Sequence, residues 1–244
     1  MTRINRRSTL QLAMVAAVAP LVGSSRAAAT VPDRLIAPPA TPMRYVRTVS
    51  REMAGGAHFT VTREFTVEFR QFAGGFMLHG NQLAAAVDAP AQLAHFARLE
   101  ESRDESAIFP LALDPFGRIL STEIAPPAGE EVRLAVEEAL TDLASQPIAE
   151  DERAQLSQFI AALQGASRRV TAHLPADLFA PASTPRREEQ RIALPGGAEG
   201  RVETSFAGER DGQTGLMRVA ARNVVTVVAD SSNRVHEEWR LSGS

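Results

Sequence analysis

The stretch FTVTREFTVEFR, residues 59–70, alternates apolar and polar side chains along most of its length. Its odd positions are apolar except at Arg63, and they hold Phe59, Val61, Phe65, Val67 and Phe69. Its even positions hold threonine, glutamate and arginine. An alternation with a period of two predicts a β-strand with one buried face and one face in water. This stretch therefore predicts a sheet that is covered on one side.

Neighbouring strands are predicted on both sides of this stretch. Glycine-containing turns at 54–56 and 73–75 separate it from β-prone segments at 43–53 and 76–87. Tight turns between consecutive strands are typical of an antiparallel meander. Residues 43–87 are therefore expected to form three strands that pair in sequence order.

A further hairpin and four more strands are predicted downstream. The segment DPFG, residues 114–117, has proline and glycine where a type I turn takes them, so residues 108–113 and 118–124 are expected to pair. In the last third of the chain, turn residues separate four β-prone segments, at 187–194, 201–207, 216–229 and 234–241.

Apolar residues at helical spacing predict three helices. The first spans residues 90–103, the second lies between Pro127 and Pro147, and the third spans residues 150–166. Strands and helices in this order predict an α+β fold class, namely a curved antiparallel β-sheet (half-barrel) with three helices packed against it. Residues 43–244 are expected to form this single β-rich domain.

The N-terminus has the three parts of a cleavable signal peptide. Three arginines at positions 3, 6 and 7 precede an apolar run over residues 10–22, and small residues end at Ala29. A run of 13 residues is short for a bilayer core, which takes about 20 residues of helix. We therefore expect cleavage after Ala29, no transmembrane segment in the mature chain, and a location in the periplasm or outside the cell.

Two further features of the N-terminal region bear on export. The string NRRSTL, residues 5–10, resembles a twin-arginine signal, so both this route and the general secretory route stay open. Residues 30–42 contain four prolines and are expected to form an extended leader.

Composition excludes several classes of chemistry. The chain has no cysteine, and all 26 basic residues are arginine, so disulfides, thiolate sites and lysine Schiff bases are absent. Removal of residues 1–29 takes away four arginines and no acid, which leaves 22 arginines against 29 acidic residues and a formal charge of −7. An acidic domain is a poor partner for nucleic acid, so no nucleic-acid binding is expected.

No sequence motif indicates catalysis or metal binding. The five histidines are at least 16 residues apart, and neither a G-x-S-x-G elbow nor a glycine-rich phosphate loop occurs. The sequence therefore predicts no catalytic residue, no metal site and no cofactor. A serine hydrolase remains an alternative, because its catalytic triad is assembled in space rather than along the chain.

The aromatic strand face is the one feature that points to a ligand. It is either ordinary core under the helices or the lining of an apolar pocket. Arg47 and Arg63 stand on otherwise apolar faces, where each needs a carboxylate partner or a polar cavity. If both point inwards, the anionic head group of an apolar ligand would suit them. The candidate ligand-binding residues are Phe59, Phe65, Phe69, Phe76, Phe96, Trp239, Arg47 and Arg63.

The order of strands and helices across residues 42–244, together with export, resembles the periplasmic lipoprotein-carrier fold group (LolA/LolB type). That resemblance implies a curved antiparallel sheet that shelters a lipid-binding cavity under helices. This chain differs in that its helices fall mainly in the middle of the domain. The leading hypothesis is a non-catalytic exported protein that binds an apolar or amphiphilic ligand, either a lipid or a lipidated partner. An envelope protein-interaction module is the second hypothesis, and the sequence indicates neither the partner nor the oligomeric state.

Overall fold

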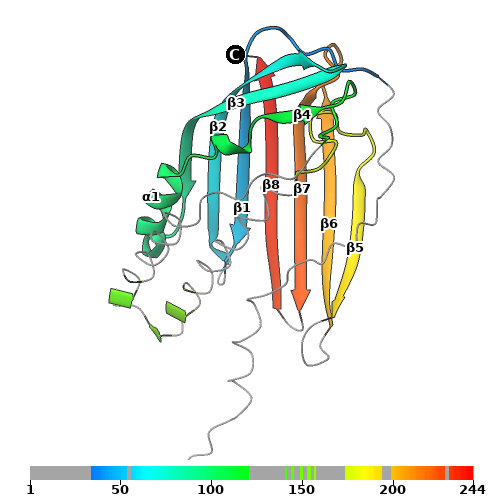
Figure 1. The fold of residues 1–244 in the computed structure, drawn as a ribbon. Helices are drawn as coiled ribbons and strands as arrows, with labels where there is room; N and C mark the ends of the chain where they lie inside the picture. The colour runs from blue at the N-terminus through cyan, green and yellow to red at the C-terminus, as the bar shows by residue number, and fades with distance from the viewer. Residues whose placement is uncertain are drawn as a thin grey trace, which may run out of the picture.

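One open antiparallel β-sheet dominates this computed structural model, which describes residues 34–53, 56–120, 174–193, 199–228 and 231–243 and isolated positions between 141 and 157. Its eight strands lie in the order β4-β3-β2-β1-β8-β7-β6-β5 (Figure 1). The strands are β1 (Met43–Glu52), β2 (His58–Phe72), β3 (Gly75–Asp88), β4 (Leu111–Leu113), β5 (Arg186–Ala193), β6 (Glu199–Arg210), β7 (Met217–Val228) and β8 (Ser231–Gly243). Strands β1 and β8 pair in the centre and join two meanders, β1–β4 and β5–β8.

The strand predictions are confirmed for most of the chain. The segments predicted at 43–53, 59–70 and 76–87 form β1, β2 and β3 and pair in sequence order. The four segments predicted in the last third form β5 to β8.

The predicted hairpin around residues 114–117 is shown in part. The turn is formed, because the Gly117 N–H donates to the Asp114 carbonyl over 2.9 Å and Gly117 has a φ of +82°. Strand β4 has only three residues, however, and a single bridge joins Leu113 to Ile119. Residues 121–124 of the predicted second arm lie outside the described residues.

The predicted half-barrel with three helices is wrong. In the part of the chain that the structure describes, the sheet is open and has one α-helix, α1 (Ala94–Ser102), preceded by the 3-10 turn η2 (Ala91–Leu93). A second 3-10 turn, η3 (Ser106–Ile108), follows it. The helices predicted between 127 and 147 and over 150–166 lie outside the described residues, apart from isolated positions. The sheet does not close, because its two edge strands, the short β4 and the charged β5, lie at opposite ends of the strand order and do not pair with each other.

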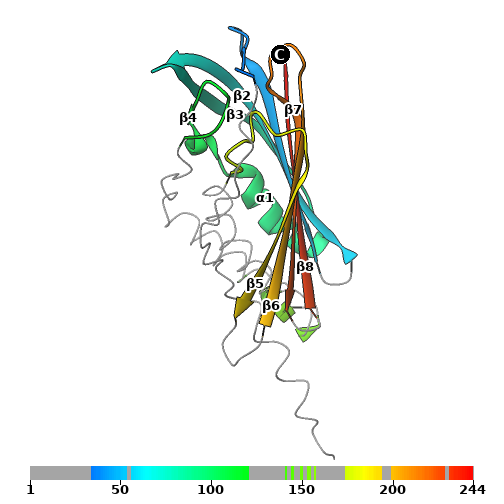
Figure 2. The ribbon, with the colours of Figure 1, turned by 90° about the vertical axis from the view of Figure 1, so that its right-hand side faces the viewer.

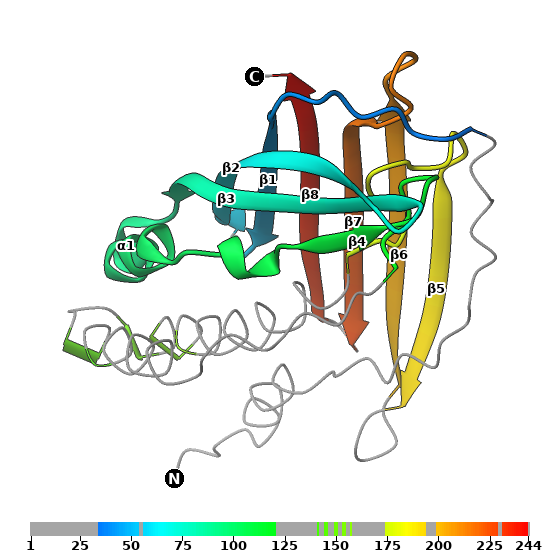
Figure 3. The ribbon, with the colours of Figure 1, turned by 45° about the horizontal axis from the view of Figure 1, so that its top comes forward.

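Strands β2 and β3 curve across the top of the other strands, as Figure 3 shows. The pairing of β2 with β3 shifts between Glu64 and Phe65, where Leu83 is an extra residue on β3. A bulge of this kind bends a strand and increases its twist. The bend brings the far halves of β2 and β3 over the segment around Phe179, which contacts Tyr45 and Phe69.

The core lies on one face of the sheet, called the inner face here because α1 covers part of it (Figure 2). Trp239, Tyr45 and Phe65 are at most 1% exposed. Leu178 and Phe179, in the segment that precedes β5, belong to the same core cluster. Of the expected leader, Ile36 is buried in this core and its N–H donates to the Pro115 carbonyl over 3.1 Å. Among the described residues, no helix has the length and apolar character needed to span a membrane.

Candidate functional site

The sheet register shows which side chains share the inner face. Arg47 is paired with Arg63 on one side and with Trp239 on the other, so all three side chains point to the same face. Val49, one step along β1 on this face, is paired with Val61 and Glu237. The exception in the alternation of residues 59–70 is therefore an inward-pointing arginine.

The predicted aromatic site residues are all in the core or at its margin. The centres of the Phe59 ring and of the Phe96 ring of α1 lie 5.6 Å apart, and both residues are at most 4% exposed. The Phe69 ring lies 6.5 Å from that of Phe76, which is half-buried. These rings contact one another as core side chains do, and their binding of a ligand stays a prediction.

Arg47 and Arg63 are brought together and receive carboxylate partners. Arg47 lies 3.4 Å from Glu105 and 3.4 Å from Glu237, while Arg63 lies 3.1 Å from Glu100 and 3.2 Å from Glu105. Each arginine side chain is at most 6% exposed. Glu100 is in α1 and Glu105 follows it, so these ion pairs attach the helix to β1 and β2.

Two more arginines complete this Arg–Glu cluster. Its members are Arg47, Arg63, Arg103, Arg222, Glu100, Glu105 and Glu237. Arg103 pairs with both Glu100 and Glu105, and the Arg222 Nε donates to Glu237 over 3.0 Å. The arginines come from three strands and the end of α1, so only the folded sheet assembles the cluster.

The electrostatic state of the cluster follows from its burial. Burial by itself raises the pKa of Glu105, but the guanidinium groups of Arg47, Arg63 and Arg103 outweigh it and lower that pKa to about 2. Burial lowers the pKa of Arg63, and the neighbouring carboxylates oppose that shift. Glu105 therefore stays charged at neutral pH.

Sequence reasoning missed the three glutamates of the cluster. Glu100 stands beside a second glutamate on a helix, a pattern that indicates a solvated flank, yet its side chain is only 12% exposed, and that of Glu237 on β8 is only 1% exposed. One signal was present, because Glu237 shares its odd phase with Val235 and Trp239 on the buried face of β8. No local signal connects Glu105 to Arg47 and Arg63, which precede it in the chain by more than 40 residues.

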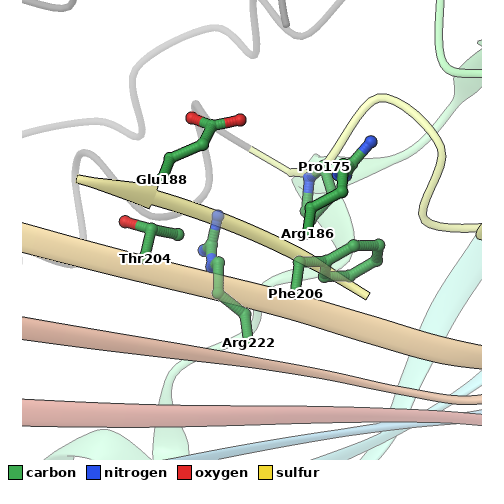
Figure 4. Close-up of a pocket in the computed structure, with 6 residues that line it drawn as sticks. All are labelled: Pro175, Arg186, Glu188, Thr204, Phe206 and Arg222. Atoms are coloured by element: carbon green, nitrogen blue, oxygen red, sulfur yellow. The ribbon is translucent and has the colours of Figure 1, made fainter. Parts of the chain in front are cut away.

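A pocket with a mixed polar and apolar lining opens on the inner face beside this cluster (Figure 4). Its volume is about 160 Å³, and its lining residues are Pro175, Arg186, Glu188, Thr204, Phe206 and Arg222. Pockets for whole drug-sized ligands are typically about 300–1,000 Å³. This pocket therefore suits a small polar group or one end of a larger molecule.

The two arginines of the pocket are held by aromatic and acidic neighbours. The Arg186 guanidinium lies 5.0 Å from the Phe206 ring centre and donates to Asp177 over 2.7 Å. Arg222 lies 5.5 Å from the Trp239 ring centre and pairs with Glu237. Stacking on rings and bonding to carboxylates fixes both guanidinium groups in place.

A row of cross-strand neighbours leads from the pocket to Arg51. In the register, Thr204 is paired with Val224, Val224 with Val235, and Val235 with Arg51. All four side chains are half-buried. Neighbouring strands are about 4.8 Å apart, so this row spans about 14 Å of the inner face.

The outward face holds the nearest approach to hydrolase geometry among the described residues. Ser50, His236 and Asn223 are successive cross-strand neighbours, and His236 Nδ1 lies 2.7 Å from Asn223 Oδ1. The Ser50 hydroxyl, however, bonds with Thr60 Oγ1 over 2.9 Å. A serine nucleophile needs its hydrogen bond to the histidine, so this arrangement does not favour a hydrolase. Within the described ranges, no cluster of three or more histidine and acidic side chains could hold a metal ion.

Comparison with protein families and with curated proteins finds no match. The inner face, with its arginines, its pocket and its half-buried valines, is therefore the feature from which a function can be inferred.

Proposed function

We propose that this chain is an exported, non-catalytic protein that binds an apolar or amphiphilic ligand on the inner face of its sheet. The ligand would be a lipid or a lipidated partner. The observation that carries the proposal is the pocket between Arg186 and Arg222, whose Thr204 is the cross-strand neighbour of the half-buried Val224 and, through it, of Val235. Polar groups at one end of an apolar surface suit a molecule that is itself polar at one end.

The side chains that line the pocket suit the binding of a ligand rather than catalysis. Its arginines are bonded to Asp177 and Glu237, and Thr204 provides the only neutral hydroxyl of the lining. Fixed donors over an aromatic floor orient a ligand. The N-terminal signal supports export, so the ligand would be met in the periplasm or outside the cell.

Native mass spectrometry of the processed protein tests the proposal. The full chain is expressed with its own signal and purified from the periplasm without detergent. We expect a mass excess that organic extraction removes, with an amphiphile recovered in the extract. A clean protein mass that added fatty acids and phospholipids do not change would contradict the proposal.

A pair of matched variants locates the ligand on the inner face. Val224 points inwards and Val225, its neighbour on β7, points outwards, and both are half-buried. The change Val224→Gln should reduce the bound fraction, whereas Val225→Gln should leave it unchanged. Equal effects of the two variants would mean that the ligand does not lie on this face.

The second candidate, an envelope protein-interaction module, is favoured by β5. This eight-residue strand ends the sheet, and within the described residues it pairs only with β6. Edge strands can accept a strand from another chain, although the charges of β5 oppose unselective pairing. Recovery of a stoichiometric protein partner without any lipid would favour this candidate over the first.

A further inference from the structure

Arg51 differs from the other inward-pointing arginines of the sheet. It lies on β1 opposite Phe59 and Val235, both of which are on the inner face. Among the described residues its side chain makes no hydrogen bond and no ion pair. Arg51 is half-buried, whereas Arg47 and Arg63 are buried, so Arg51 is the most exposed of these three inward-pointing arginines.

The surroundings of Arg51 supply no spare negative charge among the described residues. Its neighbouring carboxylates, Glu237 and Glu100, are already bonded to other arginines of the Arg–Glu cluster. Burial lowers the pKa of Arg51 to about 10, and the nearby charges of Arg47 and Arg103 contribute to that shift. An arginine at this pKa is still charged at neutral pH, and a desolvated charge without a partner is costly.

The neighbouring Arg–Glu cluster also contains hydrogen-bond donors that have no acceptor among the described residues. Arg47 Nε and Arg63 Nη1 are buried and have no acceptor among the described residues. Among the described residues, the three glutamates of the cluster are fewer than the guanidinium groups that converge here. An additional acceptor of negative charge would satisfy the most accessible of these donors, which belong to Arg51.

We infer that Arg51 binds the oxyanion head group of the ligand, which is therefore an amphiphile with a carboxylate or phosphate head group. This inference rests on the function proposed above. The planar guanidinium fork matches both kinds of oxyanion and bonds them through two parallel N–H groups. The apolar part of the ligand lies over Val235 and Val224, towards the pocket at Thr204.

The pocket arginines do not serve equally well as the anion site. Arg186 and Arg222 are each bonded to a carboxylate, and Glu188 adds a negative charge to the lining. Glu188 would repel an anion that enters the pocket. Arg51 would attract an anion, and its side chain has no partner among the described residues. The pocket end of the row therefore suits the uncharged or cationic end of a ligand.

Binding of four probes with the same twelve-carbon chain tests the inference on the processed wild-type protein. Laurate, dodecyl phosphate, dodecyltrimethylammonium and dodecyl maltoside are titrated below their micelle concentrations by isothermal calorimetry. We expect the two anions to bind at least tenfold more tightly than the cation and the neutral probe. The tighter of the two anions identifies the head group.

Variants at Arg51 test whether this residue binds the head group. We expect Arg51→Gln to weaken binding of the anionic probes by tenfold to a hundredfold, as loss of charge-assisted hydrogen bonds does. Arg51→Lys should restore part of the affinity, because it keeps the charge without the fork. Arg44→Gln is the matched control, since Arg44 is on the outward face of the same strand and pairs with Glu64; it should bind as the wild type does.

The outcomes separate the inference from the proposed function. If the wild type binds the cationic or neutral probe as tightly as the anions, the inference is wrong while amphiphile binding stands. If Arg51→Gln folds and keeps full affinity for both anions, another residue binds the head group. If no probe binds and no ligand is recovered from the periplasm, the proposed function itself is wrong. The wild-type comparison needs no variant, so it decides the question even if Arg51→Gln does not fold.

Discussion

Replacement of Glu105 by glutamine tests whether the Arg–Glu cluster stabilises the fold. The Glu105 side chain is 11% exposed and pairs with Arg47, Arg63 and Arg103. Glutamine has nearly the same shape but no charge, so the variant leaves two buried guanidinium groups, those of Arg47 and Arg63, and the half-buried one of Arg103 with one carboxylate fewer. Breaking a buried ion pair on one side typically costs about 3–5 kcal/mol.

The pKa of Glu105 provides a second measure of the same interaction. The folded protein lowers this pKa from 4.5 to about 2. At about 1.36 kcal/mol for each unit, this corresponds to about 3 kcal/mol of stability at neutral pH. Because the folded-state pKa is the lower one, this stability is present above pH 4.5 and is lost as the pH falls towards 2.

Urea unfolding of the wild type and of Glu105→Gln measures the effect. With a slope of about 2–3 kcal/mol per M, a loss of about 3 kcal/mol lowers the midpoint by about 1–1.5 M at pH 7. At pH 3 the difference between the two proteins should fall below half its value at pH 7. Glu209→Gln is the control, because its pair with Arg218 is exposed and should contribute less than about 1 kcal/mol.

Two results would refute this reasoning about the cluster. One is a loss below about 1 kcal/mol at pH 7, which would place Glu105 among ordinary surface pairs. The other is an equal loss at pH 7 and pH 3, which would mean that the glutamine acts through packing rather than through charge.

Three further predictions concern the core, a close contact and the N-terminus. Phe65 is fully buried, so Phe65→Ala should lower the free energy of unfolding by about 3–5 kcal/mol in the same urea assay, and a loss below 1 kcal/mol would contradict its place in the core. A Cβ on Gly75 would lie 2.2 Å from the Leu113 carbonyl oxygen, so Gly75→Ala should cost about 1–3 kcal/mol. Gly212→Ala, whose Cβ would meet nothing within 4 Å, is its control, and equal losses would show that the contact is unimportant. Intact-mass measurement of the exported protein should give a chain that begins at Thr30, and a mass that includes residues 1–29 would rule out the cleavable signal.

The strands were predictable because alternation is a local property of the chain. Residues 59–70 reveal a strand and its buried face without any knowledge of the partner strands. The same reasoning fails for β4, which has three residues and shows no alternation long enough to detect. It also fails for the openness of the sheet, because closure depends on whether the edge strands meet.

The candidate site was predictable only in part. Arg47 and Arg63 were singled out because a charge on an apolar face needs a partner, and both proved to be buried. Arg51 was not singled out, because it stands near the end of a strand where an exposed arginine is ordinary. What distinguishes it is that the neighbouring carboxylates are bonded to other arginines, which is a property of the assembled cluster.

The sequence by itself determined most of the strands, the buried face of residues 59–70 and the lack of cysteine and lysine chemistry, since these depend on residue types and short-range spacing. Only the tertiary structure decided that β1 lies beside β8, that Glu105 reaches Arg47 and Arg63, and that Thr204 and Arg51 end one row of the inner face. These contacts join residues far apart in the chain. The free energy that selects them comes from the packing of the whole sheet and not from any one segment.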